Sequence, residues 1–247
     1  MTGRGIPYKD VNVMHYAYAS FSNTGARPNN EDALDVRCRE ENLLAVVADG
    51  LGGHDNGELA SQLAVNSIFE ELQPEQVDED TLAYALLHAH GAIRSTPSCG
   101  KTTVAALWLS ESLGVAAHVG DSRIYQFRDG RIVYQSQDHS MVFLALTVGE
   151  ITAQELRHHK DRNKLFRVLG EETESLKVDS TELDILPGDR FLLCSDGFWE
   201  SVTEEDMLRD LEAAPTPQQW LDRMVRRISD AADPKQDNYS AICIFAE

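Results

Sequence analysis

Five aspartates stand where predicted β-strands begin or end, a position that suits ligands of a metal ion. Asp49 and Asp196 directly follow apolar runs, and Asp121 follows the run 118–120. We expect Asp32 and Asp237 at the edges of the outermost strands. An aspartate at the end of a buried strand is held on a rigid scaffold at the rim of the core. Each one alone is most simply a turn residue, but converging carboxylates repel one another unless a cation joins them. The five residues are Asp32, Asp49, Asp121, Asp196 and Asp237.

The chemistry of these residues favours a hard divalent cation. All the candidate ligands are oxygen atoms, which select Mg²⁺ or Mn²⁺ over Zn²⁺. Two such ions that share one carboxylate can lower the pKa of a water between them and direct it at phosphorus. Gly50 follows Asp49, and because it lacks a Cβ its backbone can approach an ion closely and offer a carbonyl ligand.

Composition excludes several other classes of function. The 247 residues contain 22 Lys and Arg against 41 Asp and Glu, a formal net charge of −19. Such a chain lacks the basic footprint that sequence-independent nucleic-acid binding needs. The longest apolar runs have only the length of a strand, so neither a membrane span nor an export signal is predicted. Four scattered cysteines indicate reduced thiols, and we expect a cytoplasmic protein.

Nine runs of residues predict the strands that must position these groups. Four of them follow one another between residues 102 and 135 with only tight turns, so they must be antiparallel. Asp129-Gly130 predicts a two-residue hairpin loop, which sets Phe127 opposite Ile132 and Tyr125 opposite Tyr134. The predicted strands are 14–21, 43–48, 102–109, 114–119, 123–128, 131–135, 182–186, 190–194 and 240–246.

Helices are predicted between the strand blocks. Apolar residues recur at helical spacing in 58–72 and 81–95, and Thr216-Pro217 has the residue types that open a third helix. This order predicts an α+β fold in which two packed antiparallel β-sheets are flanked by helix pairs, an α-β-β-α sandwich. We expect one domain, 1–247. Residues 139–175, rich in His, Lys and Arg, are expected to form a small flap subdomain inserted within it.

The motifs, taken together, resemble the bacterial metal-dependent serine/threonine protein phosphatases of type 2C, the PPM-type family. The resemblance covers nearly the whole chain and keeps the family's motif order. Within the predicted flap, 149–152, 162–163 and 167–170 also resemble the bacterial members. The matching motifs lie at 27–32, 47–54, 102–103, 118–123, 138–140, 194–197 and 237–238.

The resemblance implies two catalytic Mn²⁺ or Mg²⁺ ions. By this likeness Asp49 bridges both ions, and the carbonyl of Gly50 completes the first. Asp196 and Asp237 hold the second ion. A water that bridges the two ions then attacks the phosphorus directly, without a phosphoenzyme.

The same resemblance implies roles for four further residues. Asp32, with Glu31 beside it, contributes to the metal site directly or through coordinated water. Asp121 joins Asp196 in holding a third, weaker ion. Arg27 clamps the phosphate, for which a guanidinium fork is better shaped than an ammonium.

Two positions depart from the family pattern. Animal members carry a histidine, a proposed general acid, where this chain has Leu51. His54 lies nearby and is either that acid or a structural residue of the Gly-Gly-His turn. Lys101 stands where the family usually has glycine before its threonine pair, and nothing in the sequence explains it.

These observations favour a monomeric enzyme that removes phosphate from phosphoserine and phosphothreonine in proteins, the products of a partner serine/threonine kinase. A non-catalytic module that binds phosphoproteins is the alternative from another class, and hydrolysis of a small phosphorylated metabolite is a third. Gly100-Lys101-Thr102 imitates a phosphate-binding P-loop. However, residue 95 is serine and the following run predicts a strand instead of a helix. The pair His158-His159 diverges on a helix, which favours solvated residues over metal ligands.

Overall fold

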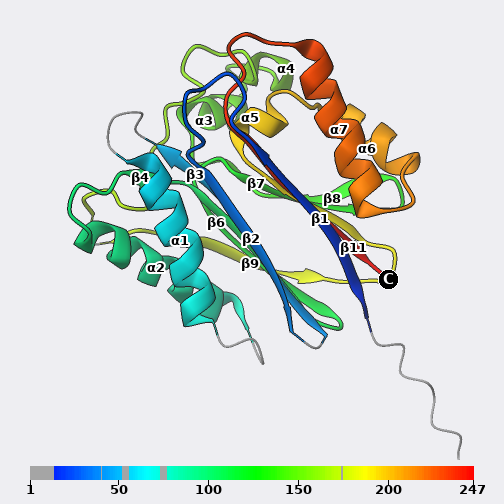
Figure 1. The fold of residues 1–247 in the computed structure, drawn as a ribbon, viewed down its shortest axis with the longest axis horizontal. Helices are drawn as coiled ribbons and strands as arrows, with labels where there is room; N and C mark the ends of the chain where they lie inside the picture. The colour runs from blue at the N-terminus through cyan, green and yellow to red at the C-terminus, as the bar shows by residue number, and fades with distance from the viewer. Residues whose placement is uncertain (1–13, 40, 52–55, 73–76, 174) are drawn as a thin grey trace, which may run out of the picture.

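Two antiparallel sheets face each other, and a helix pair covers the outer face of each (Figure 1). The computed structural model describes residues 14–39, 41–51, 56–72, 77–173 and 175–247. One pair is α1 (Gly57–Glu71) and α2 (Glu79–Ser95), and the other is α6 (Glu204–Glu212) and α7 (Pro217–Ala231). This arrangement confirms the predicted α-β-β-α sandwich.

Every neighbouring strand pair is antiparallel within the described parts of both sheets. Sheet I has the order β1 (Tyr16–Asn23), β11 (Tyr239–Ala246), β10 (Arg190–Cys194), β7 (Arg123–Arg128), β8 (Arg131–Gln135). Sheet II has the order β2 (Asp32–Arg39), β3 (Asn42–Leu51), β5 (Val104–Leu109), β6 (Leu113–Val119), β9 (Asp179–Asp184), and the short β4 (Lys101–Thr102) also pairs with β3.

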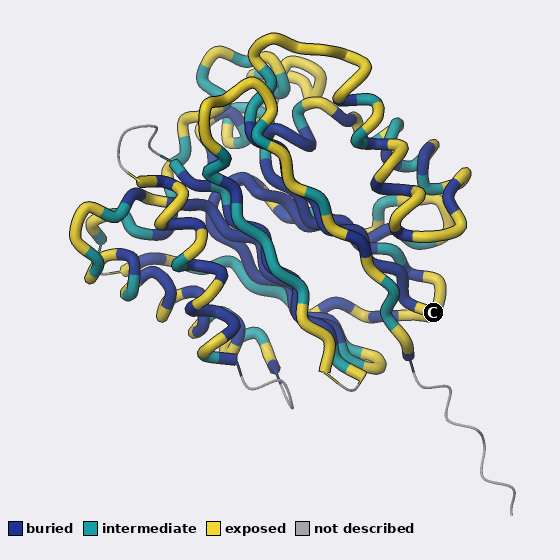
Figure 2. The backbone as a smooth tube through the Cα atoms, viewed as in Figure 1, coloured by how far each residue is buried: buried dark blue, intermediate teal, exposed yellow. Residues whose placement is uncertain are grey.

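The core has three apolar layers, and the side chains of β3 contribute to two of them. Side chains alternate between the two faces of a strand. Leu43, Ala45 and Val47 therefore face sheet I in the inter-sheet core, whereas Leu44 and Val46 pack beneath α1 and α2. Figure 2 shows the inner strands, such as β5 and β11, as continuously buried, whereas the edge strands β1 and β2 are partly exposed. A third apolar layer lies between sheet I and the helices α6 and α7.

The predicted helix faces are correct for two helices and wrong in part for a third. The buried faces of α2 and α7 carry the predicted residues, such as Leu86 and Trp220. Thr216 caps α7 by accepting a hydrogen bond from the backbone of Gln219. In α1, Leu59 is exposed although the pattern predicts it inside. The small side chain of Ala60 faces the core instead, which lets α1 approach sheet II closely.

The block 102–135 is antiparallel as predicted, but it divides between the two sheets. Strands β5 and β6 belong to sheet II, β7 and β8 belong to sheet I, and the chain crosses between them at residues 120–122. The single strand predicted at 102–109 is interrupted at Thr103. This crossing places Asp121 between the sheets.

The Asp129-Gly130 hairpin forms with positive φ at both residues, as a primed turn requires. Phe127 pairs with Ile132 as predicted. A bulge at Gln126/Phe127 then shifts the register, so Tyr134 lies opposite Gln126. The predicted Tyr125–Tyr134 pair is therefore wrong, because a bulge adds one residue to one strand.

Three elements were not predicted from the sequence: β2, α6 and the short α5 (Asp196–Trp199). Asp237 also lies differently from the expectation, because β11 is an inner strand between β1 and β10. Residues 139–175 contain α3 (Met141–Thr147) and α4 (Ala153–Leu156), at the same end of the sandwich as α5 (Figure 1). We call 139–175 the flap segment; its separate status stays a prediction.

The structure bears on the predictions about the cysteines and about membrane-spanning segments. All four cysteines lie in described parts of the chain and are free thiols. Among the residues the structure describes, no helix combines the length and apolar character that crossing a membrane requires.

Replacing Trp220 by alanine should lower the free energy of unfolding by about 3–5 kcal/mol. The indole is fully buried, meets Phe127 edge-on with ring centroids 5.2 Å apart, and donates to the carbonyl of Met207. Urea unfolding measures the change, and Tyr84→Ala, which removes an aromatic ring that is 59% exposed, is the control. A loss below about 1 kcal/mol for Trp220→Ala would contradict the assigned packing.

Candidate functional site

A cavity of about 400 Å³ opens at the end of the sandwich where β3 ends and β11 begins. The loop between β1 and β2 and the segment before β11 lie side by side there, at the top of Figure 1. The cavity is lined by Arg27, Pro28, Asn29, Glu31, Asp49, Gly50, Leu51, Asn163, Asp237 and Asn238.

Asp49 lines this cavity, and hydrogen bonds to its backbone amide and carbonyl hold it in place. Its carbonyl accepts from the Thr102 hydroxyl at 2.8 Å and from the Thr103 amide at 2.9 Å. The amide of Asp49 donates to Thr103 Oγ1 at 3.1 Å. From the sequence, Thr102 and Thr103 are identifiable only as part of a family motif. Their hydrogen bonds to the Asp49 peptide can be inferred only when the register of β3 and β4 is known.

Asp32 lies directly opposite Asp49, because the two are paired residues of β2 and β3. Asp32 is buried, and its Oδ2 accepts from the Ser195 hydroxyl at 2.8 Å. Its Oδ1 is buried without a hydrogen-bond partner in the structure. An unpartnered buried carboxylate oxygen is costly and calls for an explanation such as an ion.

Asp121 and Asp196 complete a group of mutually repelling carboxylates. Burial, followed by the charge of Asp196, raises the pKa of Asp49 and of Asp121 well above the ordinary aspartate value. Burial, followed by the charge of Asp237, raises the pKa of Asp196 to about 6. Burial also raises the pKa of Asp32 to about 7, against the hydrogen bonds from Ser240 and Ser195.

Arg27 stands at the rim of the cavity and is paired with the fifth aspartate. Its NH2 lies 2.6 Å from Asp237 Oδ2, and the Arg27 side chain is 52% exposed. Asn238 fastens the loop that carries Arg27: its amide donates to the carbonyls of Thr24 and Asn29 at 2.8 and 2.9 Å. Asn238 Oδ1 also accepts from the amide of Glu31.

Gly50 has no room for a side chain. A Cβ at this position would lie 2.3 Å from the carbonyl oxygen of Gly57 and 2.7 Å from that of Glu31. The side chain of Glu31 lies against Gly57, at the first turn of α1, where a negative charge is favoured by the helix dipole. Gly50 and Glu31 both line the cavity, as the predicted site requires.

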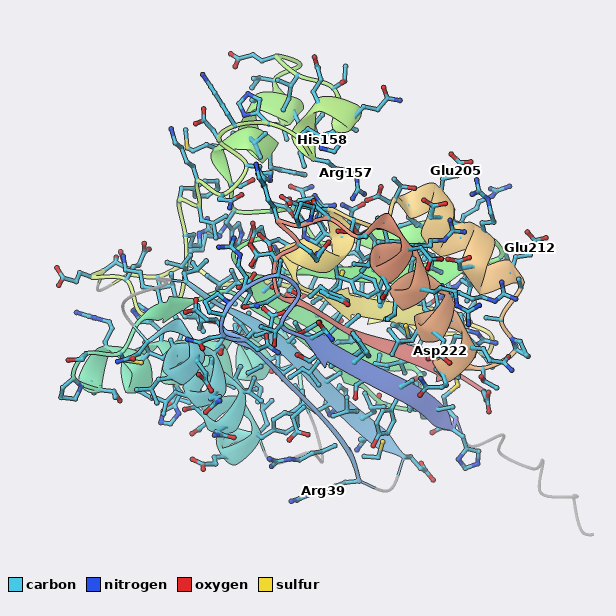
Figure 3. The ribbon with its side chains drawn as sticks, turned by 45° about the horizontal axis from the view of Figure 1, so that its top comes forward. Arg39, Arg157, His158, Glu205, Glu212 and Asp222 are labelled. Carbon is cyan, nitrogen blue, oxygen red and sulfur yellow. The ribbon has the colours of Figure 1, made fainter. Side chains whose placement is uncertain are left out.

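The remaining sequence candidates have different outcomes. His54 lies outside the described residues. Leu51 lines the cavity and pairs with the exposed Lys101 across β3 and β4, which gives no reason for a lysine there. His158 is exposed on the flap segment (Figure 3) and does not line the cavity. Asn163 of the same segment does line it, although the sequence singled it out only as part of a flap motif.

The donors present fit a hard divalent ion. They are carboxylate and carbonyl oxygens, and one buried oxygen of Asp32 has no partner. Within the described residues, no three His, Cys, Asp or Glu side chains are grouped as a ready cage for one ion. Mg²⁺ is usually held by one or two carboxylates with several waters instead of by an all-protein cage. A loose set of carboxylates around one cavity suits that mode of binding.

Comparison with known proteins gives consistent matches. The family model described as "Protein phosphatase 2C" matches residues 22–237. The chain is 35% identical over 207 residues to the serine/threonine protein phosphatase PstP of Mycobacterium tuberculosis. That match covers 79% of the chain but only 38% of PstP. A serine/threonine phosphatase of Listeria monocytogenes is 29% identical over 233 residues, which cover 88% of the chain and 90% of the relative.

The fold also matches solved structures. The catalytic domain of PstP in complex with two manganese ions superposes with a TM-score of 0.81 at 28% identity. The match covers 94% of this chain and 99% of that one.

Replacing Asp49 by asparagine should leave the metal-free protein as stable as the wild type, or more stable, at pH 8. The raised pKa values mean that the folded state binds more protons than the unfolded chain. Stability should therefore fall as the pH rises from about 4 to about 7. Asparagine removes one of the repelling charges, so its advantage should appear at pH 8 and shrink at pH 5.

Melting curves of both proteins in EDTA at the two pH values measure this difference. With Mn²⁺ added, the wild type should gain melting temperature and Asp49→Asn should gain little. A metal-free variant that melts well below the wild type at pH 8 would show that Asp49 is a structural residue.

Proposed function

The chain belongs to the protein phosphatase 2C family, and from that premise we propose that it hydrolyses phosphoserine and phosphothreonine in proteins, with bound Mn²⁺ or Mg²⁺. The observation that carries the proposal is a group of carboxylates at one cavity that Arg27 also lines. Asp49 and Asp237 line the cavity, and the charges of Asp32, Asp121 and Asp196 act on Asp49. Such a group repels a phosphate dianion unless cations lie between them, and the rim arginine matches a phosphate in charge and shape.

Five residues would hold two ions in this proposal, with a third ion at Asp121. Asp49, Gly50 and Asp237 line the cavity, and the carbonyl of Gly50 would be a ligand. Asp196 is coupled to both aspartates through its charge, and Asp32 brings the unpartnered oxygen. Bound Mn²⁺ or Mg²⁺ would neutralise phosphate charge and lower the pKa of an attacking water.

The protein's own contribution is to hold these groups in place before substrate arrives. The threonine pair fixes the Asp49 peptide from both sides. Ser195 fixes one oxygen of Asp32 and leaves the other free for an ion. Asn238 fastens the loop of Arg27 to the strand that brings Asp237. Preorganised groups of this kind need no rearrangement at the moment of reaction.

Arg27 pairs with Asp237 in this structure, besides its proposed role in binding phosphate. Its ion pair with Asp237 must loosen when the carboxylate binds an ion and the guanidinium turns to the substrate. The pair is largely solvent-exposed, so its loss costs little. With Asp237 engaged as a metal ligand, Arg27 would be free to bind the phosphate group.

The substrate class follows from the family and from chemistry. Relatives in the family are named serine/threonine phosphatases, and a phosphorylated protein is the product of a kinase reaction. We therefore place this chain opposite a serine/threonine kinase. The flap segment, which brings Asn163 to the cavity wall, would act as a subdomain that borders the substrate. A merely binding module on this fold would not need the complete set of acidic ligands, which this chain retains.

Hydrolysis of a phosphothreonine peptide should require Mn²⁺ or Mg²⁺ and cease in excess EDTA. Removing the cations leaves a negatively charged floor that repels phosphate. Release of inorganic phosphate from matched phosphothreonine and phosphotyrosine peptides measures both the metal dependence and the substrate class. Undiminished turnover in EDTA would rule out the metal mechanism. Hydrolysis of p-nitrophenyl phosphate without hydrolysis of either peptide would favour a small-molecule substrate.

Arg27→Ala should raise KM for the phosphopeptide about tenfold or more and leave Mn²⁺ affinity unchanged or tighter. The variant loses a charge-assisted contact to phosphate and also releases Asp237 from a competing cation. Steady-state kinetics and calorimetric Mn²⁺ titration separate the two effects, with Arg37→Ala, another exposed arginine, as the control. Weaker Mn²⁺ binding with an unchanged KM would mean that Arg27 is not a phosphate clamp.

A further inference from the structure

An ion pair ties the flap segment to the body of the protein at the start of α6. Arg157, which follows α4, donates from NH2 to Glu204 Oε2 at 2.6 Å. The other oxygen of Glu204 accepts from the Tyr125 hydroxyl at 3.1 Å and from Arg123 at 3.4 Å. Figure 3 labels Arg157 where the flap segment meets the body.

Trp199 lies against both arginines. The guanidinium carbon of Arg123 is 3.5 Å from the centroid of the indole ring, and that of Arg157 is 5.5 Å from it. Trp199 is buried, and its Nε1 donates to the carbonyl of Asp121 at 2.9 Å. One side chain therefore touches an arginine of the flap segment and the backbone of a candidate metal ligand.

The two arginines are not held equally. Arg123 is buried and makes a bidentate pair with Asp138, with distances of 2.9 and 2.8 Å, so it stays with the body. Arg157 has only Glu204 as a carboxylate partner among the described residues. A cavity of about 340 Å³ lies beside the pair, bordered by Arg157, Glu204 and apolar residues of the flap segment. If the pair opens, the flap segment loses this attachment and keeps the bond from Arg157 to the Val202 carbonyl at 3.4 Å and the pair of Arg162 with Glu200 at 2.8 Å.

We propose that Trp199 is a positioning residue that couples the seating of the flap segment, through Arg157 and Glu204, to the backbone of Asp121. When Arg157 is paired with Glu204, its guanidinium lies over the indole, and the indole keeps its hydrogen bond to Asp121. When the pair opens, the indole loses one of its two cationic neighbours. The role of Asp121 in metal binding rests on the proposed function, whereas the attachment of the flap segment does not.

The attachment can be tested in the metal-free protein by limited trypsin digestion. The flap segment offers exposed cleavage sites at Lys160 and Lys164. Glu204→Gln removes the charge that holds Arg157, so cleavage at these sites should become about tenfold faster. Glu205→Gln is the matched control: this neighbour is exposed, pairs only within α6 and points away from the flap segment (Figure 3). It should be cleaved at the wild-type rate.

The coupling to Asp121 is tested with Trp199→Phe, which keeps a ring for the arginines but removes the donor to the Asp121 carbonyl. Calorimetric Mn²⁺ titration should show affinity about tenfold weaker, or one class of bound ion lost, while trypsin cleavage stays close to wild type. Trp220→Phe is the control, because that indole donates to Met207, outside the site. Glu204→Gln should change both measurements.

Two results would overturn the proposal: Glu204→Gln cleaved no faster than Glu205→Gln, or Trp199→Phe binding Mn²⁺ like Trp220→Phe. If Glu204→Gln fails to fold, as judged by its melting curve, Arg157→Gln provides the same comparison, since it removes the charge that pairs with Glu204 and the guanidinium beside the indole. Neither trypsin cleavage nor calorimetry measures turnover. A chain that bound Mn²⁺ and lacked phosphatase activity would therefore refute the proposed function and leave this coupling standing.

Discussion

Mutual repulsion among buried carboxylates is the constraint around which this end of the molecule is built. Burial and neighbouring negative charge both raise the pKa values of Asp49, Asp121 and Asp196. A fold that tolerates such a group must hold its members firmly, because each would otherwise turn toward water. The firm parts are a backbone clamp from Thr103, between β4 and β5, and a hydroxyl contact from Ser195, directly after β10. The sandwich therefore serves as a frame that keeps unfavourable charges together.

The same constraint explains how the molecule handles a substrate of its own sign. The chain has a net charge of −19, so an approaching phosphoprotein meets repulsion over most of the surface. For the substrate proposed above, the charge would be reversed at the cavity that Arg27 lines, where a bound cation and this arginine would act over a few ångströms. Screening by salt reduces the long-range repulsion more than these close contacts. Selectivity for a phosphate group then arises from the cavity and not from general attraction.

The sandwich and three of the aspartates could be predicted because they are local features of sequence: apolar runs of strand length, with Asp49, Asp121 and Asp196 at the ends of three of them. Asp32 and Asp237 do not follow such runs, and their assignment depended on the family motifs. Contacts between distant parts of the chain could not be predicted. Predicting the hydrogen bond between Thr103 and Asp49 requires the strand register. The hydrogen bonds of Asn238 reach residues that are 214 and 209 positions away in the sequence. The bulge that displaces Tyr134 has no signal in the hairpin motif. The outward turn of Leu59 depends on how closely α1 packs on its sheet.

The position of β11 has a consequence for how the protein comes into being. This strand is last along the described chain, yet it lies inside sheet I between β1 and β10. Translation releases β1 long before its partner exists, so the strand that emerges first must wait with one edge unpaired. Asp237 and Asn238 arrive with the same late segment. A nascent chain thus carries an incomplete candidate site until β11 has left the ribosome and paired within sheet I.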